Sequence, residues 1–174
     1  LYAEYEMRLG HTATIVVRDS VGSHVRRISG ETLKYAADRI RTGTETTGDY
    51  NEVFKYGGNK FAADAGVLAL VVGVARKCRG PIIETGSGLS SVLMGAAGDN
   101  KVYSLEHIKH YAEQTLLWCE EAGVDNVGLC YAPMKDFWYD ISAFKLPNKF
   151  ALGFCDGPPR FFGTRMQFFK HIAP

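Results

Sequence analysis

Hydrophobic positions from about residue 59 onward follow two kinds of pattern. Short continuous apolar runs predict buried strands. They occupy residues 81–85, 101–106, 127–132 and 149–157. Between the first three runs, apolar residues recur three and four positions apart, which predicts helices over residues 89–98 and 107–122, and another helix begins after Gly163. Strands that alternate with connections of helical length predict a parallel sheet. We therefore expect an α/β fold of the Rossmann-like, doubly wound type, with a mostly parallel sheet and helices on both faces.

The pattern before residue 59 is less regular. Apolar residues at helical spacing predict one helix, which stops at Gly43. Its inner face is expected to hold Leu33, Ala36, Ala37 and Ile40. Residues 42–59 are rich in threonine and glycine, and we expect a loop or a mobile cover there. We take residues 1–58 as an N-terminal segment, a cover or an oligomerisation element, and residues 59–174 as the core. A homo-oligomer is compatible with this division.

The core is expected to open with a helix. Asn59 can cap this helix, which runs to about Cys78 and is ended by the Arg79–Pro81 turn. Its buried face is expected to contain Phe61, Ala65, Leu68, Ala69 and Val72. The apolar run within it, residues 65–75, is far shorter than the ~20 residues that a membrane span needs. We therefore interpret it as a buried helix and expect no membrane partner.

The composition of the 174-residue chain suits one domain with a hydrophobic core, because 46% of its residues are hydrophobic. A formal net charge of +1 gives no global attraction for nucleic acid, so no nucleic-acid partner is expected. The cysteines stand far apart, form no CxxC pair and have no histidine at zinc spacing. We interpret them as small buried side chains in a reducing compartment, and we expect a cytoplasmic protein.

The first predicted strand leads into a glycine turn within the sequence PIIETGSGLSSVLMG, residues 81–95. Gly86 and Gly88 let the backbone approach a ligand closely, and the helix that follows offers unpaired N–H groups. A dinucleotide-binding motif would have a third glycine, which this chain replaces by serine. Glu84 precedes the turn, and its negative charge would repel a pyrophosphate and suit a ligand with positive charge. An ordinary strand-to-helix turn would use the same glycines. This motif alone therefore does not distinguish a ligand-binding site from a plain turn.

Glu106 ends the next predicted strand, about 20 residues beyond the turn. In a nucleotide-binding βαβ unit, a carboxylate at this position accepts hydrogen bonds from the ribose hydroxyls. The alternative is an exposed carboxylate that stabilises the start of the following helix. Because Glu106 and the glycine turn occur together at the right spacing, we favour the ligand-binding interpretation.

The third predicted strand ends in the sequence YAPMKDFWYD, residues 131–140. Pro133 and Met134 offer apolar surfaces to a base, although core packing explains Met134 equally well. Trp138 and Tyr139 are candidates for an aromatic wall beside a substrate. These four side chains are therefore predicted to line a pocket.

The fourth predicted strand ends in FCDGPPR, residues 154–160. Asp156 lies where it can orient a substrate, take a proton or bind a divalent metal, or it can simply cap neighbouring N–H groups. Arg160 and Arg165 can pair with Asp156 or with an anionic substrate. No other metal ligand is predicted, so a divalent metal is compatible with Asp156 but unsupported.

Taken in order, the segments IIETGSGLSS, VYSLEH, CYAPMKDFWYD and FCDGPPR resemble class I S-adenosylmethionine-dependent methyltransferases. The closest resemblance is to the small-molecule branch whose fourth strand ends in Asp-Gly-Pro-Pro, and it covers about residues 59–174. It implies that S-adenosylmethionine is held by Glu84, Thr85, Gly86, Ser87, Gly88, Ser90 and Glu106. It further implies that His107, Pro133 and Met134 lie near the adenine. The family's sheet has additional strands after the fourth, which these residues do not supply, and any metal site stays undecided for that reason.

The resemblance implies methyl transfer from S-adenosylmethionine to an oxygen or nitrogen atom of a small-molecule acceptor. Asp156 is the first candidate for a catalytic base, and His107 is the second. One alternative is a methyltransferase-like module that binds without turnover. Another is a nicotinamide-dependent oxidoreductase, against which Glu84 and the missing third glycine argue. The identity of the acceptor is left open.

Overall fold

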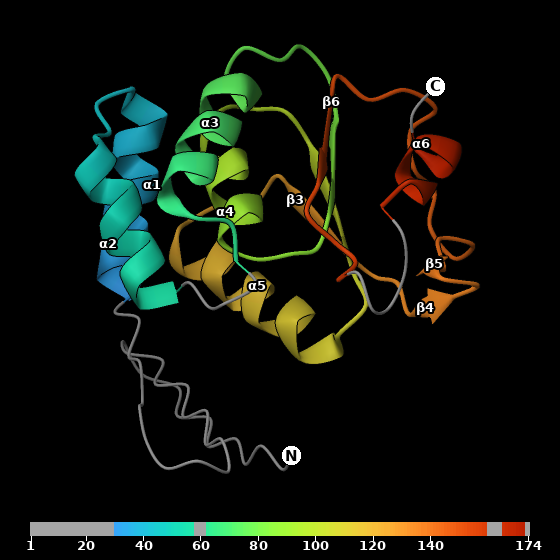
Figure 1. Ribbon diagram of the computed structural model, residues 1–174. Coiled ribbons are helices and arrows are strands. Elements are labelled where there is room, and N and C mark those ends of the chain that lie inside the picture. Colours follow the sequence, from blue (N-terminus) through green and yellow to red (C-terminus); the bar gives the residue numbers. More distant parts are fainter. Residues whose placement is uncertain (1–29, 58–61, 160–164, 173–174) are drawn as a thin grey trace, which may run out of the picture.

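The fold is built on a parallel sheet, seen in a computed structural model that describes residues 30–57, 62–159 and 165–172 (Figure 1). Its strands are β1 (Ile82–Thr85), β2 (Val102–Glu106), β3 (Val127–Tyr131) and β6 (Leu152–Cys155). All neighbours pair in parallel, in the order β3-β2-β1-β6. The chain therefore moves outward from β1 to β3 and then returns to the other side of β1. The strand order reverses between β1 and β6, which is where such sheets bind ligands.

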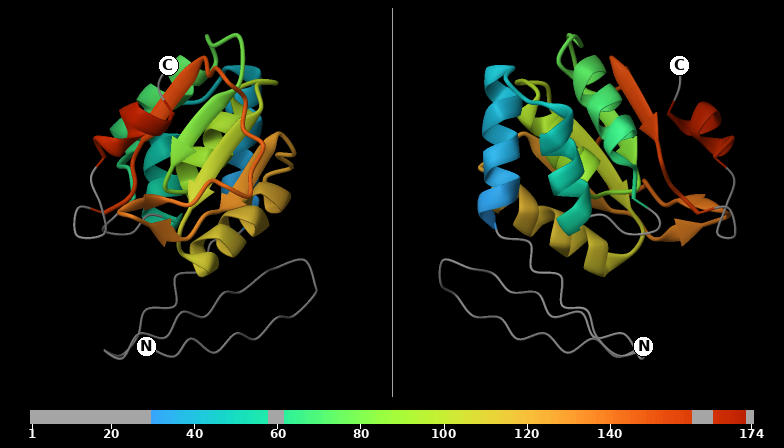
Figure 2. Two further views of the ribbon diagram at one scale, coloured as in Figure 1. Left: turned by 90° about the vertical axis from the view of Figure 1, so that its right-hand side faces the viewer. Right: turned by 60° about the vertical axis from the view of Figure 1, so that its left-hand side comes forward.

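Helices cover both faces of the sheet, as the sequence predicted, but unevenly. The helices are α1 (Gly30–Thr42), α2 (Thr47–Gly57), α3 (Ala65–Ala75), α4 (Leu89–Ala96), α5 (Lys109–Glu121) and α6 (Gln167–His171). The first five lie on one side, where α1 and α2 form an outer layer (Figures 1 and 2). The opposite face carries the short α6 and a small hairpin, formed by β4 (Met134–Lys135) and β5 (Trp138–Tyr139). The Rossmann-like α/β architecture is thus confirmed.

The two faces of the sheet each bury a hydrophobic cluster. Ile82 and Val102 face the cluster on the side of α1–α5, whereas Ile83 and Leu105 face the cluster under the hairpin and α6. Neighbouring residues of a strand point to opposite faces. Strands that are covered on both faces therefore read as continuous apolar runs, which is the pattern that located them in the sequence.

The expectation of a loop at residues 42–59 was wrong, because most of this segment forms α2. The backbone N–H of Thr46 donates to the Asp49 carboxylate at 2.7 Å, which satisfies a donor at the start of the helix. Tyr50 and Val53 are buried, and Phe54 packs against the same cluster. Burial of this face stabilises a helix whose threonine and glycine content suggests a loop.

The limits of α3 also differ from the sequence expectation. Its N-cap is Asp64, whose side chain accepts a hydrogen bond from the Val67 N–H at 2.9 Å, and the helix ends at Ala75. The predicted cap, Asn59, lies outside the described residues. Leu70 is 65% exposed, so α3 is buried on one side only. Within the described part of the chain, no helix is long and apolar enough to cross a membrane.

The predicted helix 107–122 is confirmed as α5, with one change on its inner face. The i, i+3, i+4 spacing of this segment predicts that Leu116 faces inward, but Leu116 is 51% exposed and Trp118 is buried instead. The helices α1 and α2 share one hydrophobic cluster with α3, α4 and α5. The division of the chain at residue 58 stays a prediction. The cysteines at 78, 119, 130 and 155 are free thiols, and two of them are buried.

Candidate functional site

The loops that follow β1 and β6 are joined by hydrogen bonds at the point where the strand order reverses. The backbone N–H groups of Asp156 and Gly157 donate to the carbonyl oxygen of Thr85, at 3.1 and 2.6 Å. In return the Thr85 hydroxyl donates to the Gly157 carbonyl at 2.8 Å. Thr85 was predicted to bind the cofactor. Its side chain instead holds these two loops together.

The glycine turn approaches the second loop closely. Gly86 has a φ of +84°, which strongly favours glycine. A methyl group at Gly86 would come within 3.1 Å of the Gly157 nitrogen. The turn leads into α4, where the N–H of Gly88 donates to the hydroxyl of Ser91 at 3.1 Å. Gly86 is thus required by backbone conformation and by close approach, whereas a methyl group at Gly88 would meet nothing within 4 Å.

Glu106 binds directly to the glycine turn. One of its oxygens accepts from the Ser87 N–H at 2.9 Å and from the Ser87 hydroxyl at 3.1 Å. Its other oxygen accepts from the Ile108 N–H at 2.8 Å and lies 3.1 Å from Nδ1 of His107. Burial alone would raise the pKa of Glu106, but the hydrogen bonds from His107 and from the two backbone N–H groups hold it below its ordinary value. The structure therefore places an ionised carboxylate beside the turn.

Thr115 is a supporting residue of the turn that sequence analysis did not name as one. Its hydroxyl lies 3.1 Å from the hydroxyl of Ser87 and donates to the Tyr111 carbonyl within α5. Thr115 lies at i, i+3, i+4 spacing with the apolar residues of α5, which predicts an inward position, and it is 1% exposed. A buried threonine on an otherwise apolar face was the signal for a polar contact there.

Glu84 lies behind the turn rather than open to a ligand. It is fully buried, and the hydroxyls of Ser90 and Ser91 donate to its two oxygens. The hydroxyl of Ser104 on β2 donates to it at 2.9 Å. Burial raises the pKa of Glu84 to about 7, against the effect of these three hydroxyls. Glu84 and Ser90 therefore bind each other by a hydrogen bond. Near neutral pH, Glu84 carries only part of the negative charge that was expected beside the turn.

Asp156 lies at the end of β6 and is partly open to solvent, with 29% of its side chain exposed. Burial raises its pKa, and the positive charge of Arg165 opposes this. Arg165 lies 3.7 Å from the Asp156 carboxylate and also donates to its backbone carbonyl. A carboxylate with a raised pKa suits a role as proton acceptor. Arg160, the other predicted partner, lies outside the described residues.

The hairpin β4–β5 carries the remaining predicted residues, and its Tyr139 reaches the loop after β6 at Gly157. Met134 pairs with Tyr139 across it, and Pro133 precedes it at the surface. Its turn residues, Asp136 and Phe137, have φ values of 49° and 64°. A hairpin turn with two positive φ values normally contains glycine or asparagine, and this turn contains neither. Met134 and Tyr139 are site candidates from the sequence, whereas the hairpin that carries them was not predicted.

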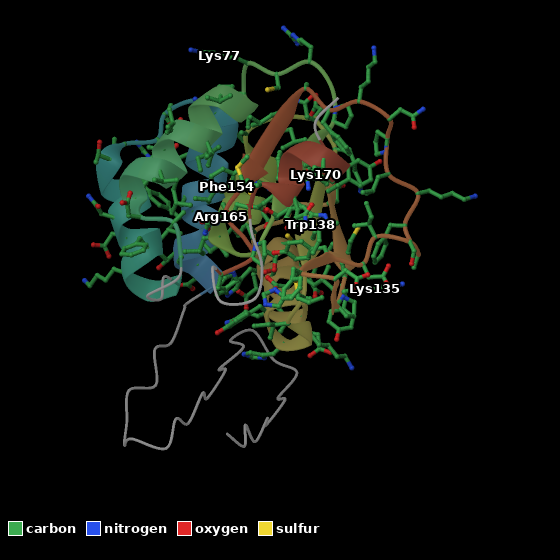
Figure 3. The ribbon with its side chains drawn as sticks, turned by 45° about the vertical axis from the view of Figure 1, so that its right-hand side comes forward. Lys77, Lys135, Trp138, Phe154, Arg165 and Lys170 are labelled. Atoms are coloured by element: carbon green, nitrogen blue, oxygen red, sulfur yellow. The ribbon has the colours of Figure 1, made fainter. Side chains whose placement is uncertain are left out.

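The two aromatic residues of β5 differ in their surroundings. Trp138 packs edge-on to Phe168 of α6, with ring centroids 6.4 Å apart, and lies inside, whereas Lys135 points outward from the hairpin (Figure 3). Tyr139 packs edge-on to the His107 ring, with centroids 5.8 Å apart. The structure thus brings Tyr139 and His107 together and places Trp138 in the core.

Comparison with known proteins gives a likeness in structure. No protein-family model and no curated protein matches the chain in sequence. Among solved structures, the chain is similar to the crystal structure of the O-methyltransferase TomG from Streptomyces achromogenes, involved in tomaymycin synthesis and solved in complex with S-adenosylmethionine. The TM-score is 0.51 at 23% identity, over 83% of this chain and 61% of that one. The chain shares the fold of that O-methyltransferase. The likeness therefore covers less than two thirds of the other protein's length.

Among the residues that the structure describes, no three His, Cys, Asp or Glu side chains are grouped so that they could hold a metal ion. Asp156 instead has Arg165 beside it. The loops after β1 and β6 and the hairpin therefore bring together carboxylates and aromatic rings.

Proposed function

We propose that the chain binds S-adenosylmethionine at the carboxyl ends of β1, β2 and β6, and transfers its methyl group to an oxygen or nitrogen atom of a small molecule. The observation that carries this proposal is the bond between the glycine turn and Glu106, at the reversal of strand order. The shared fold with an O-methyltransferase supports it.

The residues around the glycine turn fit this cofactor in charge. Glu106 and Asp156 are carboxylates near the turn, and Glu84 adds part of a third negative charge behind it. S-adenosylmethionine carries a sulfonium and an amino group, both of which these charges attract. A pyrophosphate would be repelled by the same groups. The four lone-pair sites of Glu106 are used by Ser87, Ile108 and His107, so a ribose hydroxyl would take the place of the Ser87 hydroxyl on this carboxylate.

Each residue then has a proposed role. The backbone of the Gly86–Gly88 turn holds the methionine part of the cofactor, and Glu106 holds the ribose. Pro133 and Met134 cover the adenine. The cofactor supplies the reactive methyl group, and the chain contributes orientation, because holding an acceptor close and aligned removes much of the entropic barrier. Asp156 takes the proton from a hydroxyl acceptor.

Isothermal titration calorimetry with S-adenosylmethionine tests cofactor binding. We expect binding in the micromolar range by the wild-type chain. Glu106→Ala should weaken it by about 10- to 100-fold, because charged hydrogen bonds contribute about 1.5–3 kcal/mol. Gly86→Val should also weaken it, since its side chain would collide with the second loop. Glu113→Ala, which removes an exposed carboxylate of α5, is the matched control. Absence of binding by folded wild-type protein would overturn the proposal.

A binding module without turnover is the second candidate, because Arg165 lies against the carboxylate proposed as the base. The two functions differ in one measurement. Release of S-adenosylhomocysteine is followed with phenol, catechol and amine acceptors at saturating cofactor. Release that depends on an acceptor supports the enzyme, whereas binding without release across these acceptors supports the module.

A further inference from the structure

The hydroxyl group of Tyr139 is buried without a hydrogen-bond partner among the described residues. Tyr139 is only 2% exposed, and its hydroxyl oxygen has no protein donor or acceptor within reach there. The ring is held edge-on by Trp138, at a centroid distance of 5.3 Å, and by His107. Burial of an unpaired hydroxyl destabilises a folded protein, so such a group is expected to have a partner in the functional state.

The position of this hydroxyl is defined by two glycines. A methyl group built at Gly157 would collide with the Tyr139 hydroxyl, so the absence of a side chain at Gly157 makes room for it. The same methyl group would lie 3.1 Å from the nitrogen of Gly86. The Tyr139 hydroxyl therefore lies at the junction of the loops after β1 and β6, beside the first glycine of the turn.

Negative charge gathers around this position. Burial raises the pKa of Tyr139, and nearby acidic groups raise it further. These groups are the carboxyl groups of Glu106, Glu84 and Asp156, together with the Cys155 thiol, whose own raised pKa keeps it neutral. A neutral phenol keeps its proton here, and its oxygen lone pairs are available to a donor. In such a field the favoured ligand group is positively charged and donates hydrogen bonds, as an ammonium does with its N–H donors.

We propose that the Tyr139 hydroxyl oxygen accepts a hydrogen bond from the ammonium group of bound S-adenosylmethionine, and so selects ligands that carry an amino-acid end. This inference rests on the proposed function and adds a ligand-recognition role to a residue that sequence analysis assigned to the acceptor. Gly157 takes part by leaving space for the hydroxyl. The carboxylates around the hydroxyl add attraction for the same positive charge.

The test combines Tyr139→Phe with a change in the ligand. Calorimetry measures the affinity of both proteins for S-adenosylhomocysteine and for its analogue that lacks the α-amino group. We expect Tyr139→Phe to weaken S-adenosylhomocysteine binding about tenfold, or about 1.4 kcal/mol, and to leave binding of the deaminated analogue unchanged. Tyr35→Phe, which removes a hydroxyl from the exposed surface of α1, is the matched control and should change neither affinity.

Thermal unfolding of the free proteins supplies a second readout. Because Tyr139→Phe removes a buried hydroxyl without a partner and keeps the ring, its melting temperature should equal or exceed that of the wild type. Unchanged affinity for S-adenosylhomocysteine would overturn the inference, and so would an equal loss for both ligands. A wild-type chain that binds neither ligand would instead overturn the proposed function itself.

Discussion

The buried carboxyl of Glu84 should make the stability of this protein depend on pH in an uncommon direction. Its pKa is raised by burial from an ordinary value of 4.5 to about 7. The folded state therefore binds this proton more tightly than the unfolded state does. The contribution to stability is complete below pH 4.5, decreases as the pH rises toward 7, and stays low above it. Each pKa unit corresponds to about 1.4 kcal/mol, so the full loss is about 3 kcal/mol.

Glu84→Gln isolates this effect, because it keeps the shape and the polar character of the side chain and removes the titration. The assay is urea unfolding of the wild type and the variant at several pH values between 5 and 8. At pH 8 the variant should be more stable than the wild type by up to ~3 kcal/mol. Near pH 5 this advantage should largely disappear, because Glu84 is then mostly protonated in the folded protein.

Two other carboxyl groups help to assign the pH dependence to Glu84. The pKa of Glu106 is lowered, so its contribution changes only below the pH range of the assay. Glu113→Gln removes a carboxylate that is 59% exposed on α5, and it should show no comparable pH-dependent gain. A stability difference between wild type and Glu84→Gln that is the same at pH 5 and pH 8 would refute the reasoning.

The remaining predictions concern packing and capping. Asp49→Ala should lower the free energy of unfolding by about 1 kcal/mol in urea titrations, since it removes the acceptor of the Thr46 N–H and the ion pair with Arg39; no change would mean that neither contact contributes. Gly157→Ala should lower the melting temperature, and much less so in the Tyr139→Phe background, where the colliding hydroxyl is absent; additive effects would contradict this. Gly95→Ala should destabilise by about 1–3 kcal/mol because its methyl would lie 2.5 Å from a valine carbon. Gly73 has open space around it, so Gly73→Ala should instead raise the free energy of unfolding by up to ~1 kcal/mol. If Gly95→Ala and Gly73→Ala both stabilised or both destabilised the protein, the packing argument would be wrong.

The sequence by itself determined the elements of the core. Each strand of the sheet is a continuous apolar run, and the helical spacings around α1 and α5 located those helices. The glycine turn and Glu106 were also recognisable, because a positive φ requires glycine and the spacing within a βαβ unit is narrow. These are local signals, since each depends on residues that are close together in the chain.

The tertiary structure decided what distant segments do to one another. It forms α2 by burying Tyr50 and Val53, and it builds the hairpin with two non-glycine residues in its turn. It also encloses Glu84 among serines, two of which come from α4 and one from β2. The physical reason is the same in all three cases. Burial and hydrogen bonding depend on which surfaces come into contact, and a local sequence pattern does not determine that contact. Whether the carboxyl group before the glycine turn is charged at neutral pH is therefore decided by the fold.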